Sequence, residues 1–525
     1  MRFAMLLLSL CLALPVAAEQ VLRRGNGPDV ETLDPHRIEG VGASSVVRDL
    51  FEGLTSSGPD GAPIPGAAHD WTIADDGLHY RFFLRPTARW SNGDPVTAAD
   101  FVAGLRRSVD PATGSNYSQM LAPIRNATAI IAGEAPVDSL GVVAVDAHTL
   151  DLFLDTPTPY LLGLLSHSSA YPVHRPSLAE WGSGFARAGR LVGNGAYRLQ
   201  DWALQSHIEL VRNPHYWDDA RTRIDRVFHV STEDINSEFK RYRADELDIT
   251  YTLPSAQTAW ARANLPGELK IHPYLGVYYY GLNLTRPPLR DDPRLRLALT
   301  LAVDRDIITT KVLGNGEVPA YTWVPPGVDG HAPATPEWAG WTREQRLARA
   351  RELYAAAGYG PDHPAEVEIL YNTQEDHRKI ATVIAAMWKQ WLGVNATLRN
   401  QEWKVYLQSR RQQVDTQVFR AGWIGDYNDP NTFMEILHSG HGLNDVGYAN
   451  PAFDALLDAA SRETDLSQRA QLMHDAEQQI LADLPVLPIY FYVTKRLVKP
   501  WVKGWTGNIM DHHPTQRLAI EGRLP

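Results

Sequence analysis

Residues 75–101, with the sequence DDGLHYRFFLRPTARWSNGDPVTAADF, contain the signals of a strand, a turn and the start of a helix in direct succession. Apolar and polar side chains alternate over residues 78–84, which is the period of a strand with one buried face. The turn formers Asn-Gly-Asp-Pro follow at residues 92–95. Thr97 and Asp100 then have the spacing of a capping box, ahead of apolar residues at helical spacing. The stretch therefore predicts a strand–turn–helix unit of a mixed α/β fold.

Strand and helix signals also alternate along the rest of the chain. A helix is predicted from Thr342 to Gly358, since a capping box opens it and a glycine closes it. Another is predicted from about Leu466 to Asp483, and the apolar run Val486–Val493 is typical of a strand buried on both faces. We find no repeat, low-complexity segment or linker. Two lobes that share crossing strands and one large intertwined domain both fit this pattern.

Length and composition place the chain among large globular proteins. It has 525 residues, of which 44% are hydrophobic and 21% charged, so several domain-sized units are expected. The formal net charge is −11, and no run of Lys or Arg is longer than two residues. A protein that binds nucleic acid usually has a basic stripe, so we expect no nucleic-acid partner.

The N-terminus has the features of a signal peptide. Arg2 precedes the largely apolar segment Phe3–Leu14, which is too short to cross a hydrocarbon core of about 30 Å. Small residues then suit cleavage after Ala18, so we expect residues 1–18 to direct export to the periplasm of a Gram-negative bacterium. Cys11, the only cysteine, lies inside this segment; a lipid anchor there is the alternative. A mature chain without cysteine excludes disulfides and thiol catalysis.

Catalytic motifs are missing from the sequence. It contains no H-E-x-x-H, G-x-S-x-G, Walker A or G-x-G-x-x-G pattern. His438 and His441 have metal-ligand spacing but are separated by two turn formers, so we expect a solvated loop there. For the pair His512 and His513 we expect a surface position. We therefore predict no catalytic residue, no metal and no cofactor, and a protein that is not an enzyme.

Several blocks, in the same order along the chain, resemble the periplasmic oligopeptide-binding proteins of ABC importers, which are family-5 extracellular solute-binding proteins. The blocks span nearly the whole chain beyond residue 18: LDPH (33–36), RDLFEGL (48–54), DDGLHYRFFLRP (75–86), WSNGDPVTAADF (90–101), RNPHYW (212–217), RYRADELD (241–248), NQEW (400–403), RAGWIGDYNDP (420–430) and RLVKPW (496–501). The block at 420–430 resembles the members that bind oligopeptides.

The resemblance implies a two-lobed α/β binding protein of type II, with three domains and a ligand cleft that closes by a hinge. Domain I would combine residues 19–51, 178–272 and 497–525. Domain II would be an insertion of residues 52–177, and domain III, residues 273–496, would form the second lobe.

The same resemblance assigns the charged ends of a bound peptide. Asp426 matches the family's aspartate for the α-ammonium, a charge-assisted bond worth about 1.5–3 kcal/mol. Arg420 matches the arginine that meets the carboxylate of shorter peptides, and its planar guanidinium suits bidentate pairing. His377 matches the histidine that meets longer ones. Without the resemblance, Asp426 would be read as a turn former, Arg420 as a partner in an internal salt bridge and His377 as a solvated helix start.

The resemblance also assigns the rest of the site. The peptide backbone would pair with main-chain groups near Val41 and from Gly422 to Ile424. Roomy, wet pockets would take the ligand's side chains, at positions that match Glu39, Tyr117, Tyr280, Trp403, Trp423 and Tyr492.

Two departures from the family pattern stand out. Gly276 and Ile424 occupy places where relatives can carry a cysteine pair. Leu313 stands where a lysine for longer peptides is expected, and Lys311 is two residues away. The preferred peptide length is therefore left open by the sequence.

The resemblance implies a monomeric periplasmic receptor that captures peptides of about two to five residues. It would deliver them to an inner-membrane ABC permease and its ATPases. A receptor for murein tripeptides is an alternative, because these ligands also carry a free α-ammonium. From other classes of protein, a secreted peptide hydrolase or a holdase chaperone is possible.

Overall fold

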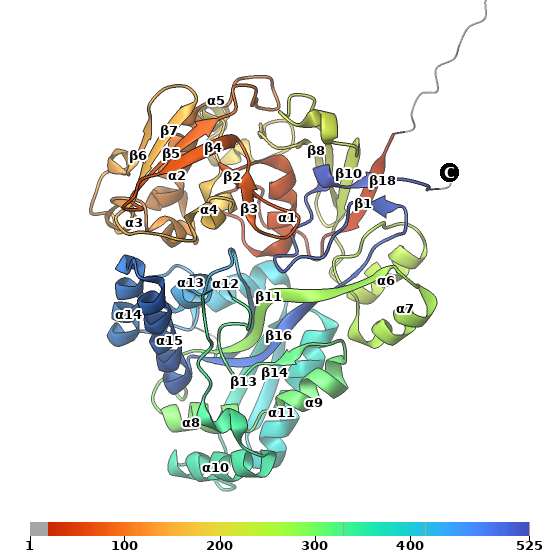
Figure 1. Ribbon diagram of the computed structural model, residues 1–525. Helices are drawn as coiled ribbons and strands as arrows, with labels where there is room; N and C mark the ends of the chain where they lie inside the picture. Colours follow the sequence, from red (N-terminus) through yellow and green to blue (C-terminus); the bar gives the residue numbers. More distant parts are fainter. Residues whose placement is uncertain (1–18, 329, 415, 524–525) are drawn as a thin grey trace, which may run out of the picture.

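Two lobes, one above the other in Figure 1, make up the computed structural model. The structure describes residues 19–328, 330–414 and 416–523, so the predicted signal peptide and Cys11 lie outside the described residues. None of the helices in these ranges is both long and apolar enough to cross a membrane.

The first lobe contains two four-stranded sheets, with strand orders β1-β10-β9-β8 and β4-β5-β7-β6. Its strands are β1 (Val21–Gly25), β2 (Thr55–Ser57), β3 (Pro63–Pro65), β4 (Ala68–Ile73), β5 (His79–Leu84), β6 (Val142–Ala144), β7 (Thr149–Phe153), β8 (Tyr197–Ala203), β9 (His207–Arg212) and β10 (Arg226–Val230). Its helices are α1 (Gly40–Leu50), α2 (Ala98–Val109), α3 (Ala127–Ile131), α4 (Leu161–Leu164), α5 (Arg175–Trp181), α6 (Ile235–Arg243) and α7 (Thr258–Asn264).

The predicted strand–turn–helix unit is confirmed in this lobe. Alternate side chains of β5 are buried, as the sequence pattern requires. The capping box forms at the start of α2, where the Asp100 carboxylate accepts the backbone N–H of Thr97 at 2.9 Å. Phe82 and Phe101 are both fully buried in the core that this unit shares with the rest of the lobe.

The second lobe is built on one six-stranded sheet with strand order β12-β16-β11-β15-β13-β14. Its strands are β11 (Leu269–Leu282), β12 (Val318–Pro319), β13 (Glu366–Asn372), β14 (Asn395–Gln401), β15 (Val418–Ile424) and β16 (Val486–Leu497). Its helices are α8 (Pro293–Leu301), α9 (Arg305–Ile307), α10 (Arg343–Ala356), α11 (Glu375–Leu392), α12 (Trp403–Gln412), α13 (Asn431–Met434), α14 (Pro451–Arg462) and α15 (Leu466–Asp483).

Both faces of this sheet are covered by helices. The core on one face includes residues of α8, α10 and α11, and the core on the other includes residues of α13, α14 and α15. Side chains of β16 enter both cores, so the prediction of a strand buried on both faces is confirmed. The helices predicted from Thr342 and from Leu466 are confirmed as α10, with its capping box, and α15.

Strands β11 and β16 connect the lobes. They pair antiparallel from Leu269 and Leu497 to Gly281 and Val486, with a register shift just after Pro273. Figure 1 shows β11 running from the region of α6 and α7 into the second lobe, with β16 beside it. The chain after β16 returns to the first lobe as β17 (Val502–Lys503) and β18 (Ala519–Ile520). The three-domain division proposed from the sequence stays a prediction.

One buried carboxylate of α15 holds a long loop in the second lobe. Glu477 accepts backbone N–H groups of Trp323 at 2.9 Å, Val324 at 2.8 Å and Ala334 at 2.6 Å. It also lies 2.9 Å from the imidazole of His331. Because Glu477 is fully buried, no water could replace it as the acceptor for these donors.

We predict that Glu477→Ala lowers the free energy of unfolding by about 3–5 kcal/mol, because it leaves several buried donors without an acceptor. Urea denaturation followed by circular dichroism measures the change. Gln478→Ala, one residue further along the exposed face of α15, is the control and should shift the midpoint little. Equal midpoints for the two variants would show that this carboxylate does not hold the loop.

Candidate ligand-binding cleft

A cavity of about 370 Å³ lies between the lobes. Its wall combines α1 and the loop before it, the stretch from Arg420 to Asp426, the part of β16 that links the lobes, and the segment from Met510 to His512. Eleven of the twelve predicted site residues line it, drawn from both lobes: Glu39, Val41, Tyr117, His377, Trp403, Arg420, Gly422, Trp423, Ile424, Asp426 and Tyr492.

Tyr280 is the exception. Its side chain is 1% exposed and packs with Tyr278 in the core on the side of α8, α10 and α11. Successive side chains of a strand point to opposite faces, and so the neighbouring Tyr279 lies on the other face and lines the cavity. In this run of three tyrosines, Tyr279 thus lines the cavity and Tyr280 does not.

Asp426 follows the end of β15, and no cationic side chain among the described residues pairs with its carboxylate. One oxygen lies 3.5 Å from His167 Nε2, and the other is buried with no hydrogen-bond partner in the part of the chain that the structure describes. Burial raises the pKa of Asp426 to about 7, although Arg48 opposes the shift. Burial and Arg48 lower the pKa of His167 to about 3, so its imidazole stays neutral and cannot balance the carboxylate. A ligand ammonium at this point would meet a carboxylate that lacks a counter-charge.

Arg420 and His377 lie together in another part of the cavity. Arg420 Nη2 donates to the Tyr492 hydroxyl at 2.7 Å, and the guanidinium lies 4.7 Å from the centre of the Tyr278 ring. No described carboxylate is within ion-pairing distance of it, so the internal salt bridge considered above is not formed. His377 Nδ1 lies 3.4 Å from the Tyr278 hydroxyl, and burial, Arg420 and Lys495 lower its pKa well below the usual value.

One edge of β15 is free where it borders the cavity. Its pairing with β11 covers the whole strand, but its pairing with β13 ends at Phe419. From Arg420 onward the described residues supply no strand on that side, although residues 420 and 422–424 line the cavity. Backbone groups on such an edge can pair with an extended ligand.

Gly422 is required by close packing at this edge. A Cβ atom there would come within 2.5 Å of the Tyr492 hydroxyl, the group that also accepts from Arg420. A larger residue would therefore displace Tyr492 and with it the support of Arg420.

Contacts across the cleft hold the lobes together. Arg411 of α12 forms an ion pair with Glu39, and Lys404 lies 3.4 Å from Asp29. The rings of Tyr117 and Trp423 stack with centroids 6.3 Å apart. Trp403 packs against the first residue of α1, since a Cβ on Gly40 would lie 3.3 Å from its ring. The structure is thus that of a closed cleft.

Both departures from the family pattern lie in the second lobe. Gly276 and Ile424 are register partners on β11 and β15, so the two positions do face each other. Neither Lys311 nor Leu313 lines the cavity. Lys495 of β16 does, and its ammonium lies 3.1 Å from both Glu317 and the Ser255 hydroxyl. The sequence pattern gave no signal for this lysine.

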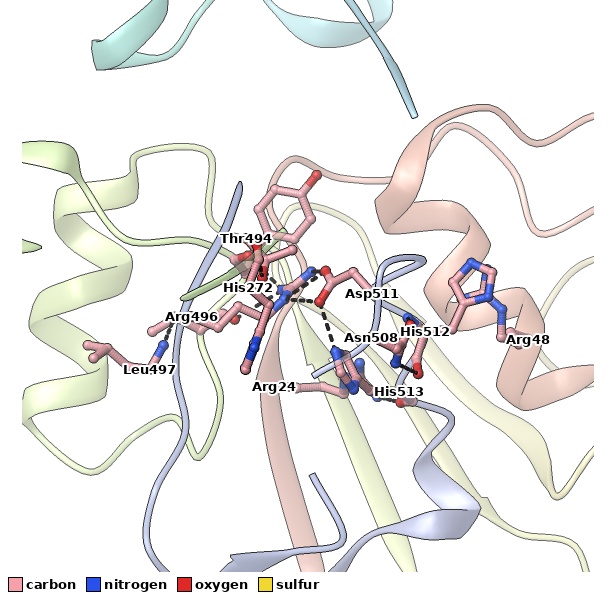
Figure 2. A network of polar contacts seen from close by, with 12 residues as sticks. Arg24, Arg48, His272, Thr494, Arg496, Leu497, Asn508, Asp511, His512 and His513 are labelled. Atoms are coloured by element: carbon pink, nitrogen blue, oxygen red, sulfur yellow. Dashed lines mark hydrogen bonds and ion pairs between the residues drawn. The ribbon is translucent and has the colours of Figure 1, made fainter. Parts of the chain in front are cut away.

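The surface position expected for His512 and His513 is wrong. Figure 2 shows both within a polar network that includes Asp511 and Arg496. His513 is 8% exposed and stacks on Trp505, while Asp511 accepts from its Nε2 at 2.8 Å and from Arg496 at 2.5 Å. His512 lines the cavity. Sequence patterns could not reveal this, because the pair also contacts Arg24, Arg48 and Ser57, which lie more than 450 positions away.

His441 is also buried rather than solvated. The described residues contain no group of three or more His, Cys, Asp or Glu side chains that could hold a metal ion.

A closed cavity between two lobes that share crossing strands is the architecture of a two-lobed solute-binding protein. The family model of the bacterial extracellular solute-binding proteins, family 5 Middle, matches residues 62–445. The chain belongs to this family.

Several characterised relatives are similar over almost their whole length. The periplasmic oligopeptide-binding protein OppA of Escherichia coli is 43% identical over 96% of this chain and 93% of its own. The periplasmic murein peptide-binding protein MppA of the same organism is 41% identical, over 94% and 91%. Its probable deoxycholate-binding periplasmic protein YgiS is 39% identical, over 97% and 95%.

Solved structures also identify the conformation. Haemophilus influenzae OppA in complex with the peptide RPPGFSPFR is 38% identical and superposes with a TM-score of 0.93, over 96% of this chain and 99% of its own. The E. coli murein tripeptide-binding protein gives 0.93 at 40% identity over the same shares. Its unliganded open form, at the same identity and over 96% and 98%, gives 0.68. Since the relative's sequence is the same, the arrangement of the lobes accounts for the difference, and this chain is not in the open form.

We predict that Asp426→Asn stabilises the ligand-free protein at pH 8. Folding raises the pKa of this carboxyl group from near 4 to about 7. The folded protein therefore loses stability as the pH rises through this range, because the buried group must ionise. The difference corresponds to roughly 4 kcal/mol as an upper bound, and at pH 4 it should vanish. Thermal unfolding at both pH values measures it. Asp75→Asn, on an exposed turn, is the control, and an Asp426→Asn variant no more stable than this control at pH 8 would contradict the assignment.

Proposed function

We propose that this protein is a periplasmic receptor that binds short peptides by their α-ammonium, backbone and carboxylate and delivers them to an inner-membrane ABC transporter. The observation that carries the proposal is the buried carboxylate of Asp426, for which the described residues supply no counter-charge in the closed cavity. A peptide ammonium would supply that charge, and the resulting ion pair would be shielded from water.

The spacing of Asp426 and Arg420 supports a short ligand. Six residues of extended chain span at most about 20 Å at 3.3 Å per residue. An extended peptide of three to five residues is about 10–17 Å long. The side chain of Arg420 would span the rest of that distance of about 20 Å. With its ammonium at Asp426, such a peptide would place its carboxylate toward Arg420. His377, beside Arg420, would meet the carboxylate of a slightly longer peptide.

The free edge of β15 explains how different sequences could be accepted. Main-chain pairing along residues 420–424 would bind the part that all peptides share, so affinity would depend little on side chains. The aromatic residues Tyr117, Trp403 and Trp423 would then form walls of side-chain pockets in which water fills the unused volume.

Murein tripeptides are the second candidate ligand, since they carry the same ammonium and one relative of 41% identity is a murein peptide-binding protein. Deoxycholate, named for another relative, has a carboxylate but no ammonium. Deoxycholate would leave the buried Asp426 unpaired, and we therefore consider it a weaker candidate ligand than either kind of peptide.

Native mass spectrometry of protein purified without denaturation is the test of this proposal. Co-purifying masses of two to five residues, released intact, are expected. Masses containing D-Glu and diaminopimelate would instead identify a murein-peptide receptor, and cleaved products of an added peptide would identify a hydrolase. A spectrum that stays empty after addition of a tripeptide pool would overturn the peptide assignment.

We predict that Asp426→Asn weakens binding of Ala-Ala-Ala at least about tenfold, because the amide cannot neutralise the ammonium and 1.4 kcal/mol corresponds to one decade. Isothermal titration calorimetry measures the affinity. Asp75→Asn should bind like the wild type. Unchanged affinity in a folded Asp426→Asn variant would refute the role of Asp426.

A further inference from the structure

Arg48 is a second cation in the cleft for which the residues described by the structure offer no carboxylate partner. It lies in the last turn of α1 and lines the same cavity as Asp426. Its Nη2 donates to His512 Nε2 at 2.9 Å. Among the described residues, no carboxylate lies within 4.0 Å of its guanidinium. The remaining N–H groups of Arg48 have no described acceptor.

His512 holds Arg48 in one orientation. A guanidinium can only donate, so Nε2 of His512 must accept, and the proton of the neutral ring is on Nδ1. That proton is donated to the Ser57 hydroxyl at 2.8 Å. Asn508 fixes the backbone of His512 from both sides, at 3.1 Å each. Figure 2 shows the imidazole next to the end of the Arg48 side chain. A chain of neutral groups therefore positions Arg48 without neutralising it.

The other cationic side chains of the cavity wall, with the exception of Arg420, form ion pairs with carboxylates of the chain. Arg410 pairs with Asp445, Lys495 with Glu317 and Arg496 with Asp511. Of the cationic side chains that line the cavity, only Arg420 and Arg48 are left without a carboxylate among the described residues. Arg420 has a role in the proposed function as the partner of the terminal carboxylate. Arg48 has none.

Arg48 and Asp426 act on the same region of the cleft. Arg48 lowers the pKa of Asp426, against the effect of burial, and it also lowers the pKa of the neighbouring His167. It does not form an ion pair with Asp426, since their side chains are more than 4.0 Å apart. A ligand whose ammonium meets Asp426 would thus have a free guanidinium beside its first residues.

We propose that Arg48, positioned by His512, forms a subsite for a carboxylate carried by one of the first two residues of the ligand. The inference rests on the proposed function, because Asp426 must first bind the ammonium. An acidic L-residue and a γ-linked D-glutamate, whose α-carboxylate branches from the second residue, share this chemistry. The receptor would then prefer peptides that are acidic near the ammonium end.

Calorimetry with matched ligands tests this subsite. Glu-Ala-Ala is compared with Gln-Ala-Ala, and Ala-Glu-Ala with Ala-Gln-Ala, at low ionic strength where charge interactions are least screened. We expect the acidic member of at least one pair to bind at least about tenfold more tightly. Ala-γ-D-Glu-Ala against its α-amide is the third pair. A preference confined to this pair would identify cell-wall peptides as the source, whereas a preference in the first two would identify ordinary peptides.

Variants assign the preference to Arg48. Arg48→Met should reduce the ratio of the two affinities to near one while the neutral peptide still binds. His512→Ala, which removes the positioning acceptor, should lower the ratio in part, a change that a purely structural role would not produce. Arg221→Met, at a highly exposed arginine outside the cavity, is the control and should keep the ratio.

Equal affinities for the acidic and neutral members of all three pairs in the wild type would overturn the inference, whatever the variants do. So would a ratio unchanged in Arg48→Met. If Ala-Ala-Ala and the neutral peptides bind, the proposed function stands in either case. Failure of every tripeptide to bind would instead overturn the proposed function and this inference with it.

Discussion

A carboxylate enclosed between two lobes with no cation to balance it is costly, and the rest of the site follows from how that cost is removed. Asp426 stays uncompensated because its neighbour His167 is held neutral by burial and by Arg48. Neutralising Asp426 within the chain would stabilise the protein but would leave nothing for an ammonium to pair with. At pH values above its pKa of about 7, Asp426 is therefore a destabilising charge in the cleft, and a ligand with a free amino group relieves it.

Closure decides whether this charge is useful. In an open cleft, water would solvate Asp426 and weaken any ion pair it forms. The closed form is held by contacts that do not involve a ligand, including the ion pairs of Arg411 with Glu39 and of Lys404 with Asp29. A relative with a solved open form shows that the lobes of this family do separate. Strands β11 and β16 connect the lobes, so such a movement must bend them, and their pairing has register shifts after Pro273 and after Tyr278.

Local patterns in the sequence predicted individual elements well. Short-range periodicity and capping predicted three elements that the structure contains. These are the strand that ends at Leu84, the helix that begins after Thr97, and the strand from Val486 that is buried on both faces. Asp426 and Arg420 could be named because they lie in one characteristic block. Tyr280 shows the limit of such matching, since a shift of one residue reverses the face of a strand.

The residues that the sequence could not reveal are those brought together by the fold. His512 reaches Arg48 and Ser57 across more than 450 positions. Lys495 reaches Glu317 across 178 positions and Ser255 across 240. No local spacing encodes such contacts. The surface position expected for His512 was therefore wrong for a definite reason: a polar, turn-rich segment near a chain end can still be folded back onto the site by charged partners elsewhere.

Titration of Ala-Ala-Ala and its N-acetyl derivative against the wild-type protein tests whether Asp426 recognises the ammonium, since only the ammonium differs between the two ligands. We expect acetylation to weaken binding at least about a hundredfold, because Asp426 is then buried without a counter-charge. Equal affinities would contradict this expectation and would mean that the uncompensated carboxylate is not what the ligand recognises.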